Sequence, residues 1–263
     1  MQFFVLFIVA MVISSIGFKK FVWFISLGYG FSMAGIGATL LVLFHKSLTP
    51  VTILLSILLI VYGCRLGFYL MLREIRSSSY QATMKNEIKD DSDMNFFLKV
   101  IVWITCALLY CCEAAPVFFR LQNQSSTDAA AILGTIIMAS GILLESISDL
   151  TKNRFKKIHP ERFCDVGLFR IVRCPNYFGE VLTWTGVFIS GITALHTPVE
   201  WLASLAGWIC IVYIMFGGAR RLEIRQNKNY GTDPEYQNYV KKTPILIPLL
   251  PLYSVEKYKW LVG

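Results

Sequence analysis

Seven long apolar stretches limit what this chain can fold into. Each approaches the roughly 20 residues that a helix needs to cross the hydrocarbon core of a membrane. A soluble domain could not bury the apolar surface of a 263-residue chain that is 55% hydrophobic and only 16% charged. The sequence therefore predicts an all-α polytopic membrane protein with about seven transmembrane helices. The predicted spans are 1–17, 21–44, 50–72, 96–119, 129–150, 178–195 and 199–218.

The basic residues predict how these spans are oriented. Lys and Arg prefer cytoplasmic loops, and the loops on one side of the predicted spans hold only Lys46 and Arg120. Nearly all other basic residues fall on the opposite side, so we expect a cytoplasmic C-terminus. The net charge of +8 then reflects membrane topology, and nucleic acid is not an expected partner. We expect an integral membrane protein, in the endoplasmic reticulum of a eukaryote or the plasma membrane of a bacterium.

The chain divides by charge into two predicted regions. Residues 1–95 form an N-terminal three-helix membrane region that ends in a charged cytoplasmic loop, and residues 96–263 form a C-terminal four-helix region with an interfacial tail. The seven cysteines contain no CxxC pair and have no accompanying His cluster, so neither a disulfide framework nor a metal site is expected. Glycines at 28, 30, 35 and 37 lie inside an apolar span, where small residues mark close helix packing.

Two polar clusters precede the centre of the chain. Arg65 lies inside the third span, on one helix face with Tyr62 and Tyr69. Its side chain can extend to the membrane surface, or it can face a polar cavity and bind an anionic ligand. Glu145 and Asp149 lie one turn apart at the end of the fifth span, just before a basic run. They fit either a solvated helix end or a site for a cofactor with hydroxyl and phosphate groups.

Two further clusters follow. Pro175 marks a helix start, whose free backbone N–H groups can receive an anion, although a basic loop that only orients its neighbouring helices has the same composition. Arg220 and Glu223 follow the last span, where arginines often do no more than fix topology. All four clusters are predicted on the cytoplasmic side, which favours a cofactor cavity there.

The order of these motifs resembles the C-terminal domain of the steroid 5-alpha-reductase family, and most of all its branch of unknown function. The resemblance covers roughly residues 60 to 250. It rests on Gly167-Leu168-Phe169 and on Arg173-Cys174-Pro175-Asn176-Tyr177-Phe178-Gly179-Glu180, preceded by Glu145 and Asp149 and followed by Glu223, Tyr236, Tyr239 and Ile247-Pro248.

This resemblance implies a membrane reductase that binds NADPH from the cytoplasm and reduces an activated C=C bond in a steroid-like or other lipid substrate. It implies that Tyr62 is the catalytic acid, donating a hydrogen bond to the substrate carbonyl, and that Arg65 faces the cofactor. The other predicted cofactor-binding residues are Glu145, Asp149, Lys156, Arg162, Arg173, Asn176, Tyr177, Glu180, Arg220, Glu223 and Tyr239. An apolar substrate and membrane lipids are the expected partners, and no protein partner is expected.

Two departures from the family leave the substrate open. The steroid reductases pair the catalytic tyrosine with a glutamate on an early helix, but this chain has no Asp or Glu before Glu74. Cys174 stands where the branch usually has a histidine.

Two alternatives remain. One is an S-adenosylmethionine-dependent membrane methyltransferase of the isoprenylcysteine carboxyl or phospholipid N-methyltransferase type, which has a similar motif but usually a Glu-Glu pair where Glu223 stands alone. The other is a lipid-binding or scaffold protein without catalysis.

Overall fold

The computed structural model describes residues 1–76 and 95–262, and within these ranges the chain is helical, without a strand. The charged loop predicted over 73–93 therefore lies mostly outside the described residues, and its first four residues belong to the helix Pro50–Arg76. The α-helices are α1 (Gln2–Ser14), α2 (Leu27–Leu43), α3 (Pro50–Arg76), α5 (Phe96–Gln122), α6 (Ala129–Ile158), α7 (Pro175–Gly191), α8 (Pro198–Tyr230) and α9 (Pro234–Lys242). Short 3-10 helices are η1 (Ser15–Phe18), η2 (Phe21–Trp23), η4 (Gly167–Arg170) and η5 (Ile192–Ala194).

Five helices in the described residues are long and apolar enough to cross a membrane: Phe21–Leu43, Pro50–Ile75, Phe96–Gln122, Ala129–Ile158 and Pro198–Tyr230. They confirm the all-helical membrane fold but not the count of seven. The predicted first span is the shorter helix Gln2–Phe18. The predicted sixth span is the 17-residue α7, which begins at Pro175 and gives way to η5 after Gly191.

The described chain forms two compact units. The first unit contains Met1–Thr135 and Val187–Gly207, and the second contains Ile136–Gly186 and Trp208–Gly263. The division falls within α6, α7 and α8, so each of these helices contributes to both units. The predicted boundary near residue 95 remains a prediction.

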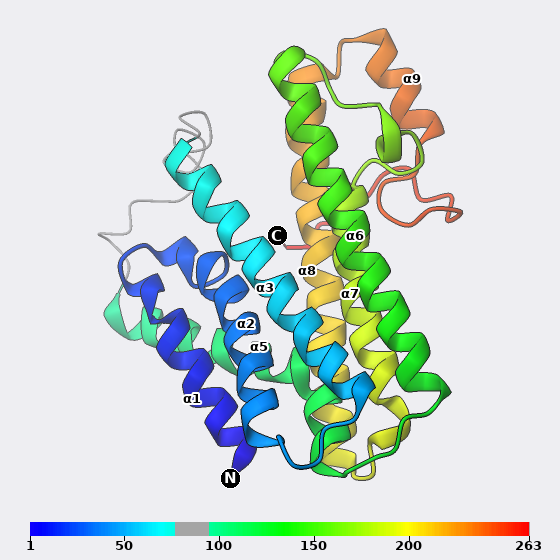
Figure 1. Ribbon diagram of the computed structural model, residues 1–263. Helices are drawn as coiled ribbons and strands as arrows, with labels where there is room; N and C mark the ends of the chain where they lie inside the picture. Colours follow the sequence, from blue (N-terminus) through cyan, green and yellow to red (C-terminus); the bar gives the residue numbers. More distant parts are fainter. Residues whose placement is uncertain (77–94, 263) are drawn as a thin grey trace. The chain divides into compact units, whose positions relative to one another are not determined.

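Close helix packing in the first unit depends on glycine. In Figure 1, α2 and α3 run side by side. A Cβ atom at Gly30 would lie 2.7 Å from the backbone nitrogen of Gly67, and one at Gly63 would lie 2.4 Å from the backbone nitrogen of Ala34. Gly37 approaches the Ser56 carbonyl oxygen in the same way. The expectation that glycines of the second span mark close packing is confirmed.

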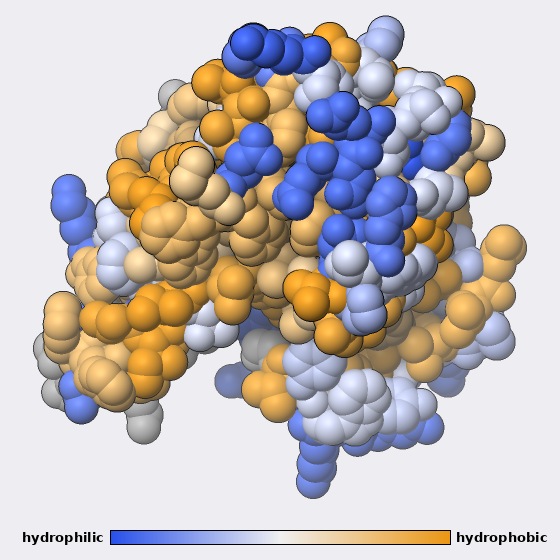
Figure 2. Space-filling model, turned by 90° about the horizontal axis from the view of Figure 1, so that it is seen from below, coloured by the Kyte–Doolittle hydropathy of each residue, from blue (hydrophilic) through white to orange (hydrophobic). Residues whose placement is uncertain are grey.

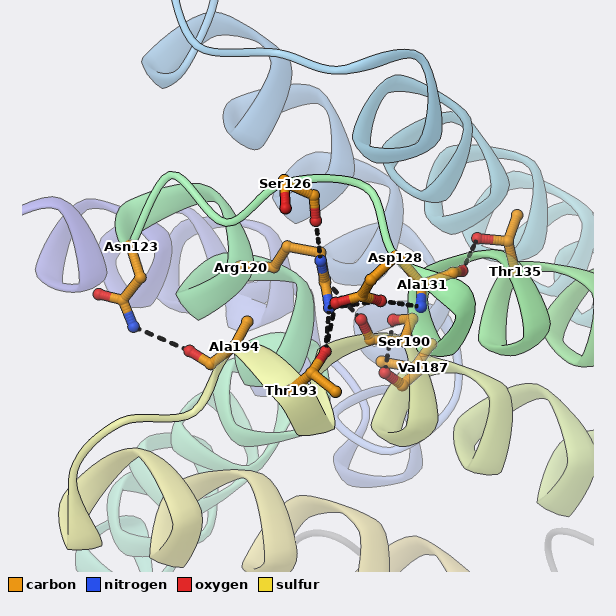
Figure 3. Close-up of polar contacts among 10 residues, drawn as sticks. All are labelled: Arg120, Asn123, Ser126, Asp128, Ala131, Thr135, Val187, Ser190, Thr193 and Ala194. Carbon is orange, nitrogen blue, oxygen red and sulfur yellow. Dashed lines mark hydrogen bonds and ion pairs between the residues drawn. The ribbon is translucent and has the colours of Figure 1, made fainter.

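A buried arginine joins the loops at one end of the first unit (Figure 3). Arg120, 1% exposed, donates to the carbonyl oxygens of Ser190 and Ser126, both at 2.6 Å, and contacts Asp128 at 3.0 Å. The Asp128 carboxylate also accepts from Thr193 and caps α6. Burial alone would raise the pKa of Asp128, but hydrogen bonds from Thr193, the Ala131 N–H and Arg120 hold it at about 2. These contacts hold the connection between α5 and α6 against the end of α7 and η5.

The connections between α2 and α3, α5 and α6, and α7 and α8 lie at the end of the first unit that Figure 2 shows from below. Hydrophilic side chains gather there over part of the face, among hydrophobic ones. A polar hollow of about 190 Å³ lies on this end, between the α2–α3 connection and the end of α5. The structure thus places polar groups where the loops meet solvent.

In the second unit, α6, α7 and α8 lie side by side (Figure 1). The C-terminal tail, residues 243–262, packs against α7 and α8. A Cβ at Gly141 would lie 2.5 Å from the Thr183 backbone nitrogen, so α6 and α7 also cross at a glycine. The tail is held by a core of Cys174, Ala219, Leu222, Ile245, Leu246, Val255 and Leu261. This packing fixes the residues on which the candidate site is built.

Candidate functional site

The predicted catalytic acid, Tyr62, is fully buried in the first unit. Its hydroxyl donates a hydrogen bond to the Tyr29 hydroxyl at 2.9 Å, and the two rings meet edge to face with centroids 6.1 Å apart. Tyr29 precedes Gly30, one of the positions where α2 and α3 approach closely. Glycine packing therefore brings the two phenols together. The close packing at the glycines was predicted from the sequence, whereas the pairing with Tyr29 was not.

Tyr110 and Glu113 of α5 extend this buried group. The Tyr110 ring lies 5.2 Å from the Tyr29 ring, and its hydroxyl donates to the Phe24 carbonyl oxygen at 2.6 Å. Glu113 follows one turn later and is 3% exposed. A carboxyl group inside an apolar helix is costly and is a functional candidate by default. That signal is present in the sequence, although Glu113 was not among the predicted site residues.

Arg65 and Tyr69 continue the Tyr62 face of α3, and both are half-buried. Farther along the helix, the Arg73 guanidinium lies 5.7 Å from the centre of the Tyr69 ring. This side of α3 thus carries the buried Tyr62 phenol, followed by the cations Arg65 and Arg73 nearer the C-terminal end of the helix. The anionic ligand expected for Arg65 stays a prediction.

Two acidic residues are buried where α6 and α7 cross. A Cβ at Gly179 would lie 2.7 Å from the backbone nitrogen of Glu145, and Glu145 and Glu180 are each 5% exposed. One carboxylate oxygen of Glu180 accepts from the Trp184 indole N–H at 3.1 Å. Asp149 lies one turn beyond Glu145 and is half-buried. Three predicted cofactor residues are thus carried by this pair of helices.

The predicted helix start at Pro175 is confirmed, because α7 begins there. Asn176 and Tyr177 follow in the first turn and are half-buried. The Tyr177 ring lies in ordinary contact distance of Gly218 on α8, with 3.4 Å between a ring carbon and an added Cβ. Cys174 is buried in the tail core, and this burial raises its pKa to about 12, so the thiol is neutral.

Arg173 and Glu223 form a buried ion pair. Their side chains are 0% and 1% exposed, and a guanidinium nitrogen lies 2.9 Å from a Glu223 oxygen. Arg173 also donates to the Tyr253 carbonyl oxygen, while the second Glu223 oxygen accepts from the Val255 backbone N–H at 2.8 Å. The pair therefore fastens the tail to α8. Their predicted role as cofactor ligands stays a prediction.

Lys156, Arg162 and Tyr239 are brought together around the Phe163 ring. The Tyr239 ring stacks on Phe163 with centroids 5.3 Å apart, and the Arg162 guanidinium lies 5.3 Å from the Phe163 centre. The Lys156 amine donates to the Tyr230 hydroxyl at 2.9 Å, and the Tyr230 ring packs against Phe163. Phe163 was not predicted as the centre of this cluster, because nothing in a local pattern indicates which rings meet.

Arg162 and Tyr239 also contact residues outside the Phe163 ring. Arg162 forms ion pairs with Asp165 at 2.9 Å and Glu235 at 3.2 Å, and these carboxylates raise its pKa, the Asp165 hydrogen bond contributing most. Burial raises the pKa of the Tyr239 phenol well above its ordinary value, and its hydroxyl donates to the Phe169 carbonyl oxygen at 2.6 Å.

Arg220 lies apart from this ring cluster, where it binds the tail. Its guanidinium donates to the Glu256 carbonyl oxygen at 3.0 Å and to the Leu261 carbonyl oxygen at 3.4 Å. Tyr62 and Arg65 belong to the first unit, and the other predicted site residues belong to the second. Their convergence on one cofactor stays a prediction.

Comparison with known proteins places the chain in a family. Over 57 residues it is 35% identical to steroid 5-alpha-reductase DET2 of Arabidopsis thaliana, a match that covers 21% of this chain and 22% of the plant protein. No solved structure matches the chain significantly. The profile of DUF1295, described as a protein of unknown function, matches residues 6–243. Because this match covers most of the sequence, the chain belongs to the DUF1295 family.

Proposed function

We propose that this protein is a membrane-embedded reductase that uses NADPH to reduce an activated C=C bond in a steroid-like or other lipid substrate. The observation that carries the proposal is the buried hydrogen bond between Tyr62 and Tyr29, which holds a phenol inside an apolar helix pair. The local similarity to a protein named as a steroid 5-alpha-reductase supports it.

The chemistry of the second unit fits a phosphate-bearing dinucleotide. Lys156 and Arg162 supply cations beside aromatic rings, and the Arg162 side chain is 45% exposed and so open to a ligand. Phosphate groups prefer such cations. Asp149 and Glu145 supply oxygen acceptors suited to ribose hydroxyls. The donors and acceptors that NADPH requires are therefore present on neighbouring elements of one unit.

NADPH, when bound, supplies the hydride. When hydride adds to the β-carbon of a conjugated C=C bond, negative charge develops on the substrate carbonyl oxygen, and the Tyr62 hydroxyl would donate a hydrogen bond and then its proton to that oxygen. The resulting enol would return this proton to the Tyr62 phenolate as its α-carbon takes a proton from water, which gives the saturated carbonyl product. Rotation of the O–H about its C–O bond moves the donor from Tyr29 to the substrate. Tyr29, 2.9 Å away, orients the phenol and takes the place of the missing early glutamate.

Thermal unfolding of the purified full-length chain tests cofactor choice. A ligand that binds only the folded state at about 100 times its Kd stabilises by about 2.7 kcal/mol. For a chain of this size that amounts to about 5–11 °C in Tm. We expect NADPH to produce this increase and S-adenosylmethionine to produce none. An increase with S-adenosylmethionine alone would favour the methyltransferase alternative, and no increase with either nucleotide would favour a non-catalytic protein.

Substitution separates catalysis from binding. Tyr62→Phe should keep the NADPH-dependent increase in Tm and lose about 10²–10⁴-fold in turnover, the usual contribution of a general acid. Tyr29→Phe should lose less, because it removes only the orienting partner, and Tyr69→Phe serves as a control on the same helix. Turnover is measured with membrane lipid extract and deuterium-labelled NADPH, by mass spectrometry of the reduced product. Unchanged turnover in Tyr62→Phe would refute the assignment.

A further inference from the structure

An apolar groove of about 400 Å³ lies in the second unit, between α8 and the C-terminal tail. Its volume is in the range of about 300–1,000 Å³ that is typical of ligand pockets. One wall is a face of α8 and the other is the tail. The lining residues are Trp208, Ile209, Val212, Tyr213 and Phe216 from α8, and Leu252, Val255, Tyr258, Trp260 and Leu261 from the tail.

The polar atoms of two lining aromatic residues are already engaged. The Trp208 indole N–H donates to the Thr185 hydroxyl at 3.0 Å. The Tyr213 hydroxyl donates to the Trp260 carbonyl oxygen at 2.6 Å and accepts from the Val262 backbone N–H at 3.2 Å. These residues therefore offer the groove only their ring carbons, which select an apolar occupant.

The tail wall is fixed in place. Arg220 donates to the Glu256 and Leu261 carbonyl oxygens, and the Asn227 amide donates to the Glu256 carboxylate at 2.7 Å. Val255 and Leu261 are buried in the tail core. The groove is therefore a preformed feature of the unit, and an occupant need not order it.

A positive charge sits at the rim. The Lys257 amine lies 5.2 Å from the centre of the Tyr258 ring, which lines the groove. Lys259 follows, and both lysines are exposed, as is Trp260 at 65%. Aromatic and basic side chains together are typical of the membrane interface. The α8 wall belongs to a helix long and apolar enough to span a membrane.

We propose that this groove binds an anionic phospholipid, with one acyl chain against the α8 and tail residues and the phosphate near Lys257 and Lys259. An apolar lining alone would accept any chain, so the rim lysines supply the preference for negative charge. The proposal rests on the groove and its two rim lysines and does not depend on the proposed function.

Tryptophan quenching by brominated lipids tests the proposal, because Trp208 and Trp260 line the groove. The full-length chain is reconstituted in phosphatidylcholine vesicles that contain a small fraction of either brominated phosphatidylglycerol or brominated phosphatidylcholine. We expect stronger quenching by the brominated phosphatidylglycerol. Removal of one lysine, by Lys257→Gln or Lys259→Gln, should weaken that preference about fivefold, the equivalent of the ~1 kcal/mol that one basic residue contributes near an anionic surface.

A substitution that fills the groove is compared with a matched substitution outside it. Val212→Phe narrows the groove and should abolish the preference, whereas Ile214→Phe, two residues along α8 at an exposed position outside the lining, should preserve it. Equal quenching by the two lipids, or a preference unchanged in Val212→Phe, would overturn the proposal. Two other results would also overturn it, both with the lipid preference retained in Val212→Phe. Loss of reductase turnover alone would mean that the groove holds substrate. Loss of self-association alone, measured by cross-linking, would mean that it holds a second copy of the chain.

Discussion

The buried pair Arg173–Glu223 allows a quantitative test of what these predicted cofactor residues do. Glu223 uses both carboxylate oxygens within the protein, one on Arg173 and one on the Val255 N–H. Glu223→Ala leaves the guanidinium buried without a countercharge and the Val255 N–H without its acceptor. In the double variant Arg173→Met/Glu223→Met, both charges are replaced by apolar side chains.

The magnitude follows from burial. Removing one partner of a buried ion pair costs about 3–5 kcal/mol, whereas replacing both with apolar groups is often nearly neutral. About 1 kcal/mol shifts the Tm of a chain of this size by about 2–4 °C. Glu223→Ala should therefore lower the Tm by about 6–20 °C, and the double variant should recover most of that loss. Arg173 favours this recovery, because its Nε and Nη1 atoms are buried and make no hydrogen bond within the described residues.

The assay is thermal unfolding in detergent, with and without NADPH. If the double variant is native-like in Tm and still gains stability from NADPH, the pair is structural and the cofactor contacts other residues. If it is native-like and loses the NADPH effect, the pair binds the cofactor, as the family resemblance implies. A Glu223→Ala variant within about 2 °C of the unsubstituted protein, where a loss of at least 6 °C is expected, would refute the reasoning from burial.

Two further predictions concern the first unit. The lowered pKa of Asp128 means that its ionised form stabilises the fold above its ordinary pKa of 3.8 and that this contribution disappears as the pH falls through about 2. Because Asp128 is 34% exposed, solvent screening reduces the contribution to about 1 kcal/mol. The difference in Tm between the unsubstituted protein and Asp128→Asn should therefore shrink between pH 4 and pH 2. A difference that stays constant over this range would contradict the assignment. Gly63→Val places a side chain 2.4 Å from the Ala34 backbone nitrogen, an overpacking that should cost about 1–3 kcal/mol in unfolding free energy. Val61→Ile, which adds a methyl group at an exposed position of α3, is the control, and an equal Tm for the two variants would show that α2 and α3 can separate without cost.

Local patterns in the sequence predicted much of this structure. Apolar length predicted the five long helices, and Pro175 predicted the start of α7, because both depend on residues close together in the chain. The count of seven was not confirmed because apolar composition does not locate helix ends. The last turn of the predicted sixth span is the 3-10 helix Ile192–Ala194, and α8 continues as a helix past the predicted end of the last span at residue 218 to Tyr230.

The sequence by itself determined that this chain is a helical membrane protein and that the glycines of its second span allow close helix packing, because hydrophobicity and the absence of a Cβ are properties of single residues. Only the tertiary structure decided which polar groups meet: Tyr29 with Tyr62, and Arg173 with Glu223. Those partners are 33 and 50 residues apart in the chain, and their contact depends on how whole helix faces pack, which no local spacing encodes.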